Sequence, residues 1–208
     1  ATVNNEIILD PAYQVKSQDE VRYDGKILKI DDEKIVIIFN KPKNVITTVS
    51  DPFARKTVMN YIKSNKRLAP VGRLDKDSTG LLLLTNDGDL HQYLTHPKNQ
   101  IPRQYDVIIE KVIDARKLNR ITRGLSIGDG EIGRAKVISQ KLIKGRCEAR
   151  LELKQGKKRE VRRIFRSVKI KLFSLNRISF GSVYIGDLKL GEYRLLSEKE
   201  INRLKKAV

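Results

Sequence analysis

The residue with the clearest chemical potential is Asp75, in the stretch Val71–Gly88 (VGRLDKDSTGLLLLTNDG). It ends a polar turn, Gly72–Asp75, and the chain then enters the wholly apolar run Leu81–Leu84. A short apolar run between turn-forming residues predicts a strand that is buried on both faces. Such a strand would hold the carboxylate on a rigid, dry element, as covalent or acid–base catalysis requires. A turn aspartate often does no more than form hydrogen bonds with its own backbone, so this pattern alone leaves both a catalytic and a structural role open.

A second stretch, Lys154–Arg166 (KQGKKREVRRIFR), carries seven basic residues and one acid, Glu160. Its apolar residues have helical spacing and predict one buried helix face; they are Val161, Ile164, Phe165 and Val168. A charge run is commonly just a solvated face. This one is nearly single-signed and rich in arginine, whose guanidinium forks onto phosphate or carboxylate. The stretch therefore favours an anionic partner.

The composition of the whole chain agrees with a polyanionic partner. The 208 residues include 43 Lys and Arg against 25 Asp and Glu, a net charge of +18. Nucleic acid is the usual partner of such a protein, and a membrane surface is the alternative. The sequence has no apolar run long enough to span a membrane and no apolar signal region. The lone Cys147 fits a reducing compartment and is expected to be a small strand residue, so we expect a cytoplasmic protein.

The elements that must position these residues are mostly strands joined by hairpins, which predicts an α+β domain with a mixed, largely antiparallel sheet. The strands expected next to the site are Ile35–Phe39, Arg103–Glu110, Ala135–Leu142, Glu148–Lys154 and Lys171–Phe180. Besides the basic helix, we expect four helices: Thr57–Lys63, one capped by Asp87 or Asp89 and ending near Thr95, Asp114–Arg123, and one opened by Ser197.

Several motifs together resemble the RsuA/RluB-type ribosomal RNA pseudouridine synthases, over about residues 35–196. They are GRLD with the Leu-rich strand, NKPKNVITT at 40–48, RQYDV at 103–107, GKKREVRRIFR at 156–166 and FSLNR at 173–177. Four positions depart from the family pattern: Asn44 and Lys169 stand where Gly is usual, Glu160 replaces Gln, and Ile164 replaces Met. Asn tolerates a left-handed backbone, whereas Lys169 leaves the local turn in doubt and Glu160 could weaken a polar contact to RNA.

The resemblance implies the pseudouridine synthase fold, a curved sheet with flanking helices around a central basic cleft. It also implies isomerisation of a ribosomal RNA uridine to pseudouridine without metal or organic cofactor. Asp75 would be the catalytic residue, either as a nucleophile or as the base that removes a ribose proton. Arg73 would fill the gap left by the flipped-out base, and Tyr105 would stack on the uracil. Arg162 would pair with Asp75, and Leu175 would pack on the other side of the base.

The same resemblance extends to partners and domains. RNA contacts are expected from basic residues of the second stretch, namely Lys157, Lys158, Arg159, Arg163 and Arg166. Residues 50–58 look slightly more like the large-subunit enzymes, and we expect a monomer that binds no membrane. Residues 1–31 resemble the C-terminal remnant of an S4 RNA-binding domain, so we expect a truncated form. The alternative interpretation is that these residues are an N-terminal strand pair of the main domain. A charged connector, Asp31–Lys34, would lead to a catalytic domain at 35–208.

Two other classes of function fit parts of the pattern. A non-catalytic RNA-binding or ribosome-assembly protein would use the same basic surfaces, although a complete set of Asp75, Tyr105 and Arg162 argues against it. A glycosidase generally needs two carboxylates that flank one bond. Asp77 and Asp87 lie near Asp75 in the sequence, but neither stands in a second catalytic motif.

Overall fold

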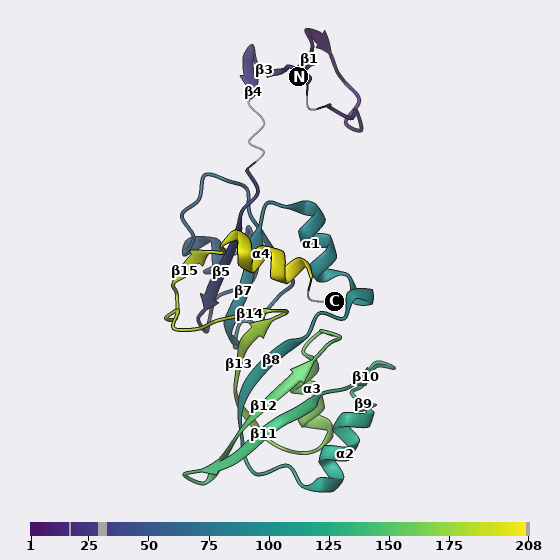
Figure 1. Ribbon diagram of the computed structural model, residues 1–208, viewed down its shortest axis with the longest axis vertical. Coiled ribbons are helices and arrows are strands. Elements are labelled where there is room, and N and C mark those ends of the chain that lie inside the picture. The colour runs from purple at the N-terminus through teal and green to yellow at the C-terminus, as the bar shows by residue number, and fades with distance from the viewer. Residues whose placement is uncertain (17, 29–32, 207–208) are drawn as a thin grey trace. The chain divides into compact units, whose positions relative to one another are not determined.

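The computed structural model of the protein describes residues 1–16, 18–28 and 33–206. The chain divides into two compact units, Ala1–Glu33 and Lys34–Val208 (Figure 1). Part of the expected connector, Asp31 and Asp32, lies outside the described residues, as does the expected end of the first domain at residue 31. We therefore describe each unit by itself.

The first unit is a small antiparallel sheet in the order β2-β1-β3-β4. Its strands are β1 (Thr2–Val3), β2 (Glu6–Ile7), β3 (Val21–Tyr23) and β4 (Lys26–Leu28). Asp24 and Gly25 connect the last two strands with positive φ angles of 52° and 73°. Asp-Gly is the pair that such a tight hairpin favours. The assignment of this unit to an S4 domain stays a prediction.

The second unit is built on a nine-stranded sheet whose main path runs β11-β12-β8-β13-β7-β5-β15. β14 pairs with β13, and β6 pairs with β7. The pair β13 and β7 is parallel and the other pairs are antiparallel, which confirms the expected mixed sheet. The strands are β5 (Val36–Lys41), β6 (Ala69–Val71), β7 (Thr79–Thr85), β8 (Arg103–Ile109), β11 (Lys136–Ile143), β12 (Arg146–Leu153), β13 (Leu172–Phe180), β14 (Val183–Tyr184) and β15 (Tyr193–Leu195).

Four α-helices are described in this unit: α1 (Gly88–Thr95), α2 (Ala115–Arg123), α3 (Glu160–Ser167) and α4 (Glu198–Lys205). The short elements are the 3-10 turns η1 (Val58–Asn60) and η2 (Pro97–Asn99) and the hairpin of β9 (Leu125–Ser126) and β10 (Ile132–Gly133). Asp87, Asp114 and Ser197 cap their helices as expected. The helix expected at Thr57–Lys63 is only η1, because the Asn60 side chain accepts the Thr57 backbone N–H and closes a single turn.

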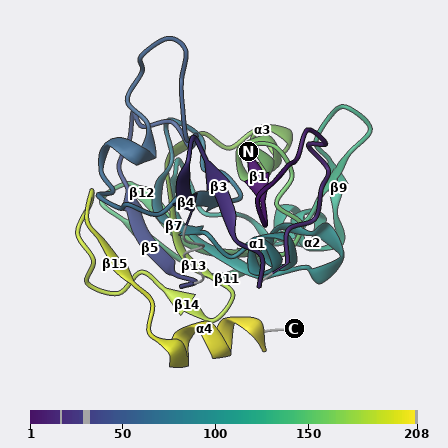
Figure 2. The same ribbon diagram turned by 90° about the horizontal axis from the view of Figure 1, so that it is seen from above.

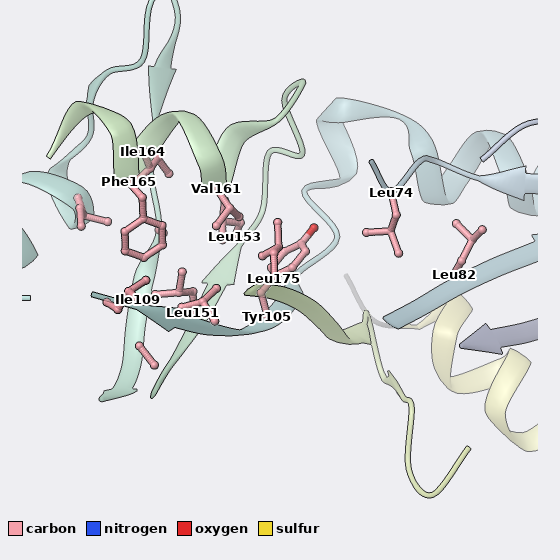
Figure 3. Close-up of a cluster of buried hydrophobic side chains, with 14 of the residues drawn as sticks. Leu74, Leu82, Tyr105, Ile109, Leu151, Leu153, Val161, Ile164, Phe165 and Leu175 are labelled. Carbon is pink, nitrogen blue, oxygen red and sulfur yellow. The ribbon is translucent and has the colours of Figure 1, made fainter. Parts of the chain in front are cut away.

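The central strands β5 and β7 are buried on both faces, as the apolar run Leu81–Leu84 predicts. Leu82 and Leu84 pack into one hydrophobic cluster with residues of α2 and α3, which Figure 3 shows in part. Leu81 and Leu83 pack into a second cluster with residues of α1 and α4. Each leucine in this run is fully buried, so the strand is a stiff support for the turn that precedes it.

Two backbone positions answer questions that the sequence leaves open. Asn44 has a φ of 63° and Lys169 one of 54°, so both residues adopt the left-handed conformation that Gly takes easily. Gly80 is required for another reason: a Cβ atom there would lie 2.2 Å from the Arg177 carbonyl oxygen on β13. The parallel pairing of β7 with β13 thus depends on a missing side chain. Among the described residues, no helix has the length and apolar character to cross a membrane.

Candidate active site

Asp75 lies in a turn that hydrogen bonds stabilise on both sides. Before it, the Thr47 hydroxyl donates to the Leu74 carbonyl at 2.8 Å and accepts the Leu74 N–H at 3.2 Å. After it, the Ser78 N–H donates to the Asp75 carbonyl at 3.0 Å. The Leu74 side chain is buried beneath the turn, while the Asp75 side chain keeps 29 % of its surface exposed. The carboxylate is therefore fixed in place yet open to a ligand.

Lys41, which the sequence did not single out, supports the same turn from inside. Its side chain is fully buried, and its ammonium donates to the carbonyls of Pro42 and Ser78, both at 2.9 Å. Burial lowers the pKa of Lys41 to about 8, partly countered by the nearby carboxylates of Asp75 and Asp77. The only sequence signal was its place in the NKP motif, because its partners are backbone carbonyls that no residue type reveals.

Two arginines from the start of α3 approach one oxygen of the Asp75 carboxylate. Arg162 Nε lies 3.4 Å from Oδ2 and Arg159 Nη1 lies 3.3 Å from it. Arg162 also donates from Nη2 to the Ser78 hydroxyl at 3.1 Å. The expected contact between Arg162 and Asp75 is thus present, although the pair is more open than expected. Arg159 is an additional partner, held at the N-terminal end of the helix by a left-handed φ of 53°.

A pocket of about 110 Å³ opens beside this carboxylate. Asp75, Tyr105 and Leu175 line it, and the latter two residues are nearly buried. Figure 3 shows Tyr105 beside Leu175, between Leu153 and Leu74. Arg73 is exposed and also borders the pocket. The structure thereby brings the five residues predicted for the catalytic centre to one place, and their roles there stay predictions.

The wall of the pocket contains two further arginines, Arg103 and Arg177, that the sequence did not mark as functional. Arg177 is 2 % exposed and donates from Nε to the Leu81 carbonyl on β7 at 2.7 Å. Both guanidinium groups stack on the Phe180 ring, at 4.7 Å for Arg103 and 5.3 Å for Arg177. Burial is the main cause that lowers the pKa of Arg103. The pocket is consequently a strongly cationic environment.

Glu160 has a structural role that differs from the one the sequence suggested. It is buried, and one carboxylate oxygen accepts the N–H groups of Gly156 and Lys157, each at 3.0 Å. Burial raises the pKa of this carboxyl, against the effect of these hydrogen bonds. Its acceptors are thus turned to the chain's own backbone, where they hold the loop before α3. The effect of Glu160 on an RNA contact stays a prediction.

The basic residues expected to bind RNA divide into two groups. Lys158, Arg159 and Arg166 are exposed and stay available for phosphate. Lys157 instead donates from Nζ to the Ile132 carbonyl at 2.6 Å. Arg163 is also engaged within the protein, because its guanidinium binds the segment between β9 and β10. These internal contacts give Arg163 a structural role, and its expected phosphate contact stays a prediction.

Cys147 and His91 each have a simple structural place. Cys147 is buried in β12, which confirms that it is a small strand residue. His91 lies with Nε2 3.1 Å from the Pro70 carbonyl. Within the described residues, no group of three or more His, Cys, Asp or Glu side chains could hold a metal ion.

The site and the fold together define a class. Residues 35–167 match the family model described as RNA pseudouridylate synthase. The chain belongs to this family, in its RsuA/RluB branch, and has the pseudouridine synthase fold. It is therefore an RNA pseudouridine synthase, an isomerase that acts on RNA.

Individual relatives cover nearly the whole chain. Ribosomal large subunit pseudouridine synthase B of Bacillus subtilis is 30% identical over 207 residues, which span 98% of this chain and 84% of the relative. An uncharacterized RNA pseudouridine synthase of Mycobacterium leprae is 34% identical over 192 residues, 90% of this chain and 75% of the relative. A crystal structure of a pseudouridylate synthase superposes with a TM-score of 0.76 at 26% identity, and covers 98% of this chain and 87% of that one.

Proposed function

We propose that this enzyme converts a uridine of ribosomal RNA to pseudouridine, with large-subunit RNA favoured and Asp75 as the catalytic residue. The observation that carries the proposal is the pocket lined by Asp75, Arg159, Tyr105 and Leu175. Arg159 and Arg162 both approach the Asp75 carboxylate there. The choice of ribosomal RNA rests on the Bacillus subtilis relative, which is named for the large ribosomal subunit.

The reaction balances without a co-substrate. The bond from the ribose C1′ to uracil N1 breaks, the uracil turns within the pocket, and a bond from C1′ to C5 forms. C5 loses its hydrogen and N1 gains one, so the product is an isomer of the substrate. Asp75 acts on the sugar, and both of its possible roles fit an open carboxylate: attack at C1′ or removal of a ribose proton.

The other residues of the pocket act on the base. A base inside a helix is out of reach, so the target nucleotide must leave its stack; Arg73, at the rim, would fill the gap. Tyr105 and Leu175 would hold the uracil between them. When the glycosidic bond breaks, the electron pair leaves with the uracil. The partly buried Arg103 and the buried Arg177 then supply fixed positive charge, which acts most strongly where water is excluded.

The test uses unmodified transcripts of large-subunit and small-subunit ribosomal RNA and chemical mapping of pseudouridine. We expect one modified position in the large-subunit transcript with the wild-type chain and none with Asp75→Asn, whose RNA affinity should fall little. Asp77→Asn is the matched control, because it removes an exposed carboxylate from the same turn and should leave turnover nearly intact. Substantial turnover by Asp75→Asn would refute the assignment of the catalytic residue. Modification only of other RNA would refute the substrate.

A further inference from the structure

The segment between β5 and β6 carries an apolar side chain that the catalytic site does not use. Phe53 is 75 % exposed, the highest exposed fraction among the aromatic side chains that the structure describes. In Figure 2 this segment, drawn in blue, projects from the second unit toward the same side as the β9–β10 hairpin. Phe53 belongs to this segment, and its exposed ring is accessible to a partner.

The loop around Phe53 is held in one shape by an ion pair. The Asp51 carboxylate accepts two hydrogen bonds from the Arg55 Nε and Nη2 atoms and two from the backbone N–H groups of Phe53 and Arg55. The bond from Arg55 lowers the pKa of Asp51 to about 2, so the pair stays ionised at any physiological pH. The Arg55 guanidinium lies over the Phe53 ring at 5.1 Å from its centroid. Ring and cation are thus ordered before any partner arrives, which reduces the entropy that binding costs.

The base of this loop is joined to the catalytic turn. Ile46 donates its N–H to the Lys56 carbonyl and accepts the Val58 N–H, which closes the loop. Thr47, the next residue, makes the two hydrogen bonds to Leu74 that fix the Asp75 turn. Six residues of extended chain reach at most ~20 Å, so Phe53 cannot lie far from Thr47. A ligand at Asp75 and a ligand at Phe53 can therefore be parts of one RNA.

We propose that Phe53 is a stacking platform for an unpaired base of the substrate RNA, next in space to the target uridine. The inference rests on the proposed function. Aromatic rings bind single-stranded nucleic acid by stacking on bases, and nearby cations hold the backbone. Arg55 lies over the ring, and Lys43 and Lys56 are exposed in the same segment. Asp51, the one acid in residues 43–56, is neutralised by Arg55. This charge balance selects an RNA rather than an apolar protein surface as the occupant.

The experiment compares variants of the full chain on one RNA probe, a hairpin whose unpaired loop contains uridine and 2-aminopurine. Phe53→Ala should weaken binding by roughly 5- to 100-fold, the range that loss of one base–aromatic stack gives. Phe53→Trp should bind the probe as tightly as wild type. Both wild type and Phe53→Trp should quench the fluorescence of 2-aminopurine. Phe53→Leu keeps an apolar side chain without a flat ring, and should bind as weakly as Phe53→Ala. Tyr184→Ala, which removes an exposed aromatic ring from β14, is the control and should bind as wild type.

Each other outcome argues against the platform. Equal affinity of Phe53→Ala and Tyr184→Ala would show that the ring does not touch RNA. Full binding by Phe53→Leu would point to an apolar contact, as with a protein partner. Because binding is measured without turnover, the result is independent of Asp75: a chain that binds through Phe53 but forms no pseudouridine would leave this inference standing and refute the proposed reaction. With an active transcript, Phe53→Ala should raise KM and leave kcat nearly unchanged.

Discussion

Two guanidinium groups share one oxygen of Asp75, and they are not equivalent. The Arg162 side chain is 20 % exposed and is additionally bonded to Ser78, whereas Arg159 is 47 % exposed. An exposed ion pair contributes little because water screens it and its side chains are mobile. A partly buried and anchored group positions its partner more firmly. At the scale of single residues, we therefore expect Arg162 to orient the carboxylate and Arg159 to contribute mainly charge.

This difference predicts how two matched variants behave. Arg162→Met should lose about 100-fold in turnover, since a small misplacement of a catalytic group has effects of that size, and should keep most of its RNA affinity. The loss in stability should be about 1–2 kcal/mol, below the cost of breaking a fully buried pair, because Asp75 is partly exposed. Arg159→Met should lose less turnover and more affinity. Single-turnover kinetics and equilibrium binding separate the two effects, and equal turnover in both variants would contradict the ranking.

Lys41 gives a prediction for the dependence of stability on pH. Its pKa is about 8 in the folded chain, against an ordinary value of 10.5. Below pH 8 the ammonium is protonated in both states, and burial destabilises the folded one. Between about pH 8 and 10.5 the unfolded chain binds more protons, so the contribution of Lys41 to stability rises with pH. The total gain is at most about 3 kcal/mol, from the size of the shift.

The measurement is urea unfolding of wild type and Lys41→Met at several pH values from 7 to 10. The free energy of unfolding of wild type minus that of the variant should increase over this range. The difference is the informative quantity, because other groups, such as the buried Cys147 thiol with its raised pKa, titrate in both proteins and cancel. A difference that is flat or falls with pH would mean that the Lys41 ammonium is not penalised by burial.

At the scale of elements, Arg163 of α3 holds the segment between β9 and β10. Its guanidinium donates to the carbonyls of Ile127 at 2.8 Å and Gly128 at 2.7 Å, and it forms ion pairs with Asp129 and Glu131. Its side chain is 16 % exposed. The helix is thereby tied to a loop more than thirty positions earlier in the chain, which helps to fix the direction of its first turn and of Arg162.

Replacement of this arginine should mainly affect stability. Arg163→Met leaves three carbonyls and two carboxylates without their donor, and we expect a loss of about 2–3 kcal/mol in the free energy of unfolding. Arg166→Met, one turn further along the same helix and exposed, should change it by no more than about 0.5 kcal/mol. Thermal and urea unfolding give both values. If the two variants have similar stabilities and Arg163→Met binds RNA more weakly, the phosphate contact that the sequence suggested would be supported instead.

Arg162 and Arg163 show which contacts the sequence could predict and which it could not. Helical spacing identified the buried face of α3, and the apolar run Leu81–Leu84 identified a strand that is buried on both faces, because both patterns are local. The adjacent Arg162 and Arg163 look alike in sequence. Arg162 contacts Asp75 and Arg163 contacts the β9–β10 segment, and only folding brings these partners close to the two arginines. Lys41 was missed for the same reason, since its partners are carbonyls of a distant turn.

At the scale of the whole molecule, the net charge of +18 must be divided between cations that face RNA and cations that serve the fold. Arg163, Arg177 and Lys41 are engaged inside the protein. Lys158, Arg159 and Arg166 lie exposed on or next to α3, and Arg159 lines the pocket. Binding to RNA releases condensed counterions for each phosphate that a cation neutralises. The salt dependence of affinity thus counts the cations that face RNA.

The triple variant Lys158→Ala, Arg159→Ala, Arg166→Ala should flatten the plot of log affinity against log salt by about 2–3 units of slope, close to one unit per lost contact. The control removes the same charge from α4 and its end, with Lys199→Ala, Arg203→Ala and Lys206→Ala, three exposed positions. If net charge alone governed binding, both triple variants would flatten the slope equally. A larger effect of the α3 variant would show that RNA follows the surface next to Asp75, because only phosphates in contact release their counterions. An unchanged slope in the α3 variant would mean that its cations are merely solvated.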